Sequence, residues 1–140
     1  MKQTVILSIE GRQTYADQEP EVIELVTEGT LEQQPDGWII SYEESDLTGM
    51  QGVTTTFTVR DKKLILTRTG KLNSQMVFQE GVHHESLYQM EFGALMLSVC
   101  ARMIRVELSA EGGTVDLSYG IEIEHSEAGV IDYHLQIQPK

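Results

Sequence analysis

Apolar and polar residues alternate with a period of two along most of this chain, and no other feature restricts its fold as strongly. Between residues 53 and 60, valine, threonine and phenylalanine at odd positions alternate with threonine and arginine at even positions. Successive side chains of a β-strand point to opposite faces, so this alternation predicts strands with one buried face. The pattern also covers residues 4–11, 22–33, 38–44, 64–69, 73–79, 83–88, 114–124 and 130–138.

Turn residues separate these segments. Pro35, Asp36 and Gly37 supply turn chemistry between two of them, which predicts a hairpin. Many short strands with frequent turns are typical of an antiparallel sandwich or barrel. A chain of 140 residues holds one ordinary core. We therefore expect a single all-β domain over residues 1–140.

Residues 92–108 fit two structures equally well. Polar residues at positions 98, 102, 105 and 109 recur as they do on one face of an amphipathic helix. A strand also fits, provided that a bulge near Met103 keeps apolar side chains on the core face. That face would carry Leu95, Leu97, Val99, Ala101 and Met103 before the bulge, and Ile104, Val106 and Leu108 after it. Periodicity alone leaves both structures open.

Charge and cysteine content restrict the partners and the compartment. The chain has 22 Asp and Glu against 10 Lys and Arg, a formal net charge of -12, which repels nucleic acids and anionic membrane surfaces. The apolar run at residues 5–9 is too short for a signal peptide or a membrane span. Cys100 is the only cysteine, so no internal disulfide can form. We expect a cytoplasmic protein that binds neither nucleic acids nor membranes.

A series of short motifs resembles one known family. In chain order they are Glu28-Gly29, Tyr42-Glu43-Glu44, Gly49, Gly52-Val53-Thr54-Thr55, Leu66-Thr67-Arg68-Thr69-Gly70, Met76-Val77-Phe78, Tyr88, Gly93 and Leu117-Ser118-Tyr119. Together they span nearly the whole chain and are similar to the YwiB-like family of small bacterial proteins. The resemblance implies a calycin-like antiparallel β-barrel, closed or nearly closed, of about 8–10 strands, with residues 93–108 as a long bent strand. It implies no agreed activity and no catalytic residues.

Glu44 and Arg68 are the main candidates for a binding site. Strict alternation places each on the face of its apolar neighbours, so both are expected to point into the barrel, where an unpaired charge is costly. One interpretation is that Arg68 binds a ligand carboxylate or phosphate at a barrel mouth, with hydroxyl groups and rings supplied by Tyr42, Tyr88 and Tyr119. The other is a structural ion pair, Arg68 with Glu44 or Glu28, that plugs one end of the barrel.

The remaining reactive residues form no recognisable site. His83 and His84 are adjacent, so on a regular strand they point to opposite faces, and we interpret them as solvated surface residues. Cys100 lies in an apolar run with no histidine nearby in sequence. No motif for a nucleophile, a phosphate loop or a metal is present. We therefore expect no catalytic residues, no metal and no cofactor.

The sequence leaves three functions open. The leading hypothesis is non-catalytic binding of a small apolar or amphipathic molecule in the barrel. The first alternative is a protein-interaction module whose barrel is filled by side chains, with an edge in residues 93–108 forming a homodimer. The second is an enzyme with a mouth site built from Glu44, Arg68 and Tyr88.

Overall fold

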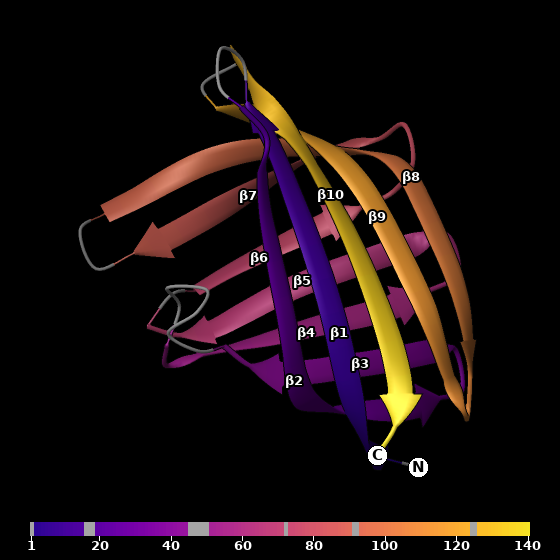
Figure 1. Cartoon of the computed structure of the whole chain (residues 1–140). Helices are drawn as coiled ribbons and strands as arrows, with labels where there is room; N and C mark the ends of the chain where they lie inside the picture. Colours follow the sequence, from indigo (N-terminus) through magenta and orange to yellow (C-terminus); the bar gives the residue numbers. More distant parts are fainter. Residues whose placement is uncertain (1, 16–18, 45–50, 72, 91–92, 124–125) are drawn as a thin grey trace.

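Ten antiparallel strands form a closed barrel in the computed structural model of the chain, which describes residues 2–15, 19–44, 51–71, 73–90, 93–123 and 126–140. The strands are β1 (Lys2–Tyr15), β2 (Glu21–Gln34), β3 (Gly37–Glu43), β4 (Val53–Arg60), β5 (Lys63–Gly70), β6 (Asn73–Phe78), β7 (His83–Met90), β8 (Gly93–Ser109), β9 (Gly112–Ile123) and β10 (Ser126–Pro139). Each strand pairs with the next in sequence, and β1 pairs with β10 to close the barrel (Figure 1). The predicted all-β antiparallel barrel is confirmed. Within the described ranges, no helix is long and apolar enough to cross a membrane.

The extent of backbone pairing between neighbouring strands varies around the barrel. The long strands β1, β10 and β9 lie side by side on one side of the molecule, and β3 to β6 cross behind them (Figure 1). The β1–β10 ladder is long, whereas the described parts of β6 and β7 share two residue pairs, Asn73 with Gln89 and Ser74 with Tyr88. One further bridge joins Gln79 and Val82 beyond the strand ends. The β6–β7 seam is therefore the weakest part of the wall.

The centre of the barrel is filled by side chains. Ile40 lies opposite Phe57, and Phe57 lies opposite Leu66, so consecutive strands add to one apolar layer. The rings of Phe78 and Tyr119 pack with their centroids 4.4 Å apart. A filled interior is usual for a small barrel. Two hollows, described below, lie at the ends of the barrel.

The ambiguous segment is a strand, β8, with a bulge between Ala101 and Met103. The prediction that Met103 faces the core is wrong, because it lies opposite Ser118 on the outer face. Arg102 is exposed, as alternation predicts, but the bulge leaves Met103 on the same outer face, so the change of face comes one residue earlier than predicted. The core face carries Leu97, Val99 and Ala101 before the bulge and Ile104, Val106 and Leu108 after it. The side chain of Leu95 lies outside the described residues.

Candidate functional site

A row of mostly polar residues crosses the inner face of four neighbouring strands. Tyr42 lies opposite Thr55, Thr55 opposite Arg68, and Arg68 opposite Ser74. Opposed residues in a sheet have Cβ atoms about 4.5–5.5 Å apart, so neighbouring side chains can interact. We call these four residues the polar row.

Glu44 joins the polar row from the position that follows β3. Its backbone N–H donates to the carbonyl of Val53 (2.8 Å), which continues the β3–β4 pairing beyond Glu43. Thr55 Oγ1 donates a hydrogen bond to Glu44 Oε1 (2.8 Å). Glu44 and Arg68 are each only 7% exposed. The structure thus places both charges inside the barrel, as alternation predicts.

Tyr133 reaches the polar row from β10, on the opposite side of the barrel. Arg68 Nη2 donates to Tyr133 Oη at 3.2 Å. The Tyr133 ring stacks on that of Tyr119 with centroids 6.3 Å apart, and it meets Phe57 edge to face. Packing on two sides restricts the ring, so its hydroxyl group stays beside the guanidinium.

The electrostatic environment keeps Tyr42 protonated. Burial is the largest cause that raises the pKa of the Tyr42 hydroxyl well above that of a free phenol. The negative charge of Glu44 and the hydrogen bond to Glu44 raise this pKa further, whereas Arg68 lowers it. Tyr42 is therefore a neutral donor to Glu44 at any ordinary pH.

These groups line a small cavity of about 120 Å³ at this end of the barrel. That volume holds about four water molecules at their liquid density. One wall is polar, with Tyr42, Glu44, Arg68, Tyr133 and Gln13. The other walls are mostly apolar, with Ile9, Gly11, Ile23, Leu25 and Ile131. The cavity can take the polar end of a small molecule while its apolar part contacts the aliphatic wall. We call this cavity the Arg68 mouth.

Two glycines let the aromatic residues approach the neighbouring strands. A Cβ atom on Gly29 would lie 2.6 Å from the carbonyl oxygen of Ser41 and 2.7 Å from Leu7 Cδ1. Gly29 pairs with Tyr42, and because Gly29 has no side chain, β3 can lie close to β2 at this position. A Cβ atom on Gly11 would lie 3.3 Å from Tyr133 Cε1. Bare backbone at these two positions shapes the Arg68 mouth.

Three of the five predicted site residues come together, namely Tyr42, Glu44 and Arg68. Tyr119 is 2% exposed in the core, where it supports Tyr133 rather than lining the cavity. The backbone of Tyr88 lies opposite Ser74, but its side chain lies outside the described residues.

Sequence reasoning missed three residues of this region, Thr55, Ser74 and Tyr133. The alternation of β4 and β10 already puts Thr55 and Tyr133 on the inner face. Only the strand register shows that they meet Arg68 and Glu44.

Ser74 has a buried hydroxyl group that lacks a partner. The residue is 7% exposed, and its Oγ makes no hydrogen bond to any described residue. Buried hydroxyl groups are usually hydrogen-bonded, and leaving one unpaired costs about 1–3 kcal/mol. Ser74 lies opposite Arg68 in the β5–β6 ladder but is not among the residues that line the Arg68 mouth.

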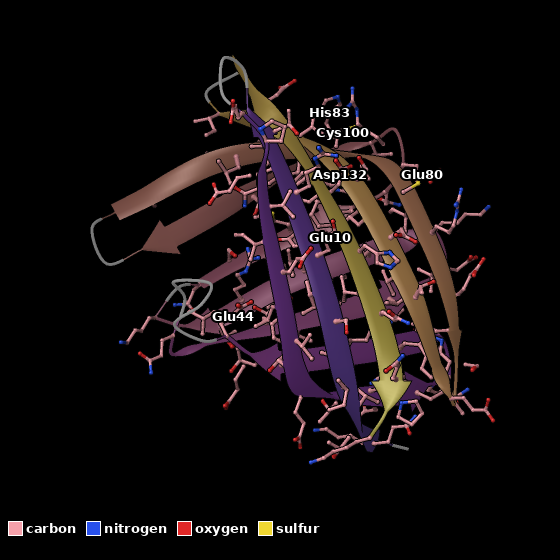
Figure 2. The ribbon with its side chains drawn as sticks, in the orientation of Figure 1. Glu10, Glu44, Glu80, His83, Cys100 and Asp132 are labelled. Carbon is pink, nitrogen blue, oxygen red and sulfur yellow. The ribbon has the colours of Figure 1, made fainter. Side chains whose placement is uncertain are left out.

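His83, His84 and Cys100 lie elsewhere on the barrel, on β7 and β8. His84 Nε2 is hydrogen-bonded to Gln79 Oε1 at 2.8 Å. The register of β7 and β8 places His83 opposite Cys100, a proximity that the sequence did not indicate (Figure 2). Among the described residues, no three His, Cys, Asp or Glu side chains are placed to hold a metal ion.

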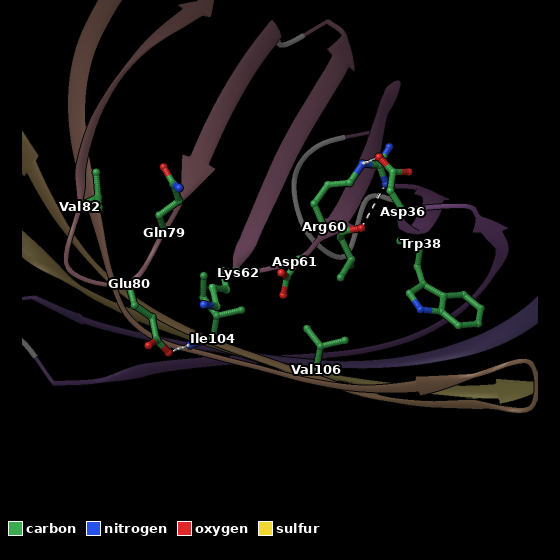
Figure 3. Close-up of a pocket in the computed structure, with 12 residues that line it drawn as sticks. Asp36, Trp38, Arg60, Asp61, Lys62, Gln79, Glu80, Val82, Ile104 and Val106 are labelled. Carbon is green, nitrogen blue, oxygen red and sulfur yellow. Dashed lines mark hydrogen bonds and ion pairs between the residues drawn. The ribbon is translucent and has the colours of Figure 1, made fainter.

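A larger groove of about 790 Å³ lies at the other end of the barrel (Figure 3). Figure 2 shows Glu44 and Glu80 on opposite sides of the molecule, near the two hollows. In the groove, Arg60 is held by Asp36 (3.3 Å) and Gln34 (2.7 Å). The apolar lining consists of Trp38, Val59, Val82, Ile104 and Val106. No sequence motif marked this groove, because hairpin turns and β8 form it together.

Comparisons with known proteins agree on the fold and give no activity. A family model described as a domain of unknown function, DUF1934, matches residues 7–137. The chain is 29% identical over 139 residues to a Bacillus subtilis (strain 168) protein named uncharacterized beta-barrel protein YwiB, covering 95% of this chain and 96% of that protein. It also resembles the crystal structure of the ywiB protein from Bacillus subtilis, with a TM-score of 0.88, 21% identity, and coverage of 99% of this chain and 93% of that one.

Proposed function

This chain belongs to the DUF1934 family, and from that premise we propose that its barrel binds a small amphipathic molecule at the Arg68 mouth without catalysing a reaction. The observation that carries this proposal is the pair of charged side chains, Arg68 and Glu44, buried beside a cavity with an aliphatic wall. Burying these charged groups costs desolvation free energy that a core of apolar side chains would not require. Their presence beside open space supports a binding role.

The chemistry of the cavity favours a ligand with a carboxylate or another anionic oxygen group. The Arg68 guanidinium offers N–H donors in a planar fork that matches a carboxylate. The hydroxyl group of Tyr133 accepts a hydrogen bond from that guanidinium. Glu44 accepts hydrogen bonds from Thr55 and Tyr42, so it forms part of the polar wall beside Arg68.

The larger groove is less suited to this role. Its Arg60 guanidinium already bonds Asp36, Gln34 and the carbonyl of Val59. The Arg68 mouth, at about 120 Å³, is much smaller than this groove, at about 790 Å³. It therefore admits only a small polar group. We therefore expect a short apolar chain that ends in a single acidic group.

Titration with straight-chain carboxylates from butyrate to decanoate, followed by calorimetry, tests this function. Arg68→Gln removes the charged donor and is expected to weaken binding roughly tenfold to a hundredfold, because hydrogen bonds to charged groups contribute about 1.5–3 kcal/mol. Arg105→Gln, which removes an arginine from β8 away from this mouth, is the matched control and should bind like the parent.

Stability separates this proposal from the structural ion pair. If Arg68 serves only as one partner of a buried structural ion pair, Arg68→Gln should lower the free energy of unfolding by about 3–5 kcal/mol. In that case no carboxylate binds either protein. Saturable binding to the parent, lost in a folded Arg68→Gln variant, supports the site.

A further inference from the structure

β8 continues beyond the strand that covers its outer edge. The β7–β8 ladder runs from Met90 and Gly93 to His83 and Cys100, whereas β8 itself extends to Ser109. On its other side β8 pairs with β9 up to Ser109. The β7 side of β8 makes one further contact at Ala101, which bridges to Glu80 and whose carbonyl accepts from Gly81 N–H at 3.0 Å. Within the described ranges, no strand pairs with this side of β8 after Ala101. The second half of β8 is therefore a free sheet edge, which borders the groove of Figure 3.

The hydrogen-bonding groups on this edge can be assigned. Ile104 N–H points away from β9, because it donates to Glu80 Oε1 at 2.8 Å. In an antiparallel ladder, the N–H and C=O of one residue point to the same side, and the side alternates along the strand. The N–H and C=O groups of Val106 and Leu108 therefore point to the same free edge as those of Ile104.

We propose that this edge pairs with the same edge of a second copy of the chain, in an antiparallel ladder centred on Val106. In that register Val106 faces Val106 of the second copy, and Ile104 faces its Leu108. Both pairs lie on the apolar face of β8. Two barrels would thereby share one sheet across a twofold axis, and the contact would close on itself as a dimer.

Charge complementarity selects the second copy as the occupant. Arg105 and Glu107 lie on the exposed face of β8. In the ladder centred on Val106, Arg105 of each copy lies directly opposite Glu107 of the other. Opposite charges at such positions stabilise a sheet, and like charges destabilise it. An arbitrary peptide strand would lack this twofold match.

Two features keep the proposed dimer weak. Each copy carries a net charge of -12, so the two repel one another at low ionic strength. Glu80 also competes with the second copy, because its carboxylate occupies the Ile104 N–H that the Leu108 carbonyl would take. A charged side chain placed against an edge is one way in which proteins limit such pairing. We expect a reversible dimer that strengthens with added salt.

Sedimentation over a wide range of concentrations tests the dimer with charge-reversal variants. Arg105→Glu and Glu107→Arg each create two like-charge contacts across the axis and should weaken dimerisation about tenfold. The double variant with both changes restores the pairs and should dimerise like the parent. Glu10→Arg on β1 changes the net charge in the same way as Glu107→Arg and is its control. This variant should dimerise at least as well as the parent.

Mixing the two single variants gives the sharpest outcome. Arg105→Glu presents two acids and Glu107→Arg presents two bases, so the mixture should form a heterodimer more tightly than either variant forms a homodimer. Failure of the mixture and of the double variant to dimerise would overturn the register. A parent that stays monomeric at all concentrations, with or without salt, would overturn the proposal. Arg68 is untouched in all these proteins, so the result is independent of ligand binding.

Discussion

Arg68 lies directly opposite Ser74 in the β5–β6 ladder, with the buried hydroxyl of Ser74 unpaired among the described residues. In the free protein this hydroxyl reduces stability, because its desolvation is not compensated. Ser74 does not line the Arg68 mouth, so its effect on stability can be measured separately from ligand binding.

Replacing Ser74 with alanine is therefore expected to leave the free energy of unfolding unchanged or to raise it by about 1 kcal/mol. The matched control is Ser86→Ala, because Ser86 is also a buried serine but donates to the carbonyl of Gln75. That change should lower stability by about 1–2 kcal/mol. Urea denaturation of both variants gives the comparison, and equal losses would contradict this account of Ser74.

The raised pKa of Tyr42 links stability to alkaline pH. The unfolded chain loses this phenolic proton near pH 10, whereas the folded protein retains it. Above pH 10 the folded state therefore binds more protons than the unfolded state, so stability falls as pH rises and is unaffected below pH 10. Tyr42→Phe should flatten this decline, as measured by denaturation at pH 8 to 11. Parallel pH profiles for parent and variant would count against a buried Tyr42 beside Glu44.

The close approach at Gly29 makes a steric prediction. A methyl group there would meet the backbone oxygen of Ser41 at 2.6 Å, so Gly29→Ala must displace β3 and should cost about 1–3 kcal/mol. Gly120→Ala is the matched control in another strand, because the nearest atom to its new methyl would be 3.9 Å away. Thermal unfolding should show a large loss for the first and little change for the second.

The β4–β5 turn contains a residue in an unfavourable conformation. Lys62 has a positive φ of 60°, a region in which glycine carries no steric penalty. Lys62→Gly should therefore raise the free energy of unfolding by up to about 1 kcal/mol. Lys63→Gly, at the first position of β5, is the control and should lower it. A loss of stability in both variants would show that the Lys62 side chain makes a stabilising interaction of its own.

Much of the fold follows from a redundant signal. Period-two alternation is repeated over many strands, so single exceptions such as Ile6 do not change the prediction. The same alternation correctly put Tyr42, Glu44 and Arg68 inside the barrel. It failed at Met103, because the bulge lies between Ala101 and Met103, one residue earlier than predicted.

The site was harder to predict because it depends on register. Tyr133 lies 65 positions beyond Arg68, and no local pattern indicates that closure of the barrel brings them together. The same holds for His83 and Cys100, which meet only through the β7–β8 ladder. Alternation determines which way a side chain points, whereas the pairing of strands determines which side chain it meets.

Native mass spectrometry of the chain, purified without denaturation from its own cells, tests the central claim most directly. We predict a second species that is heavier by one small acidic molecule, whose mass disappears on denaturation and is absent from a folded Arg68→Gln variant. A bare chain in the parent, with no added mass after incubation with the straight-chain carboxylates, would contradict a binding function for the Arg68 mouth.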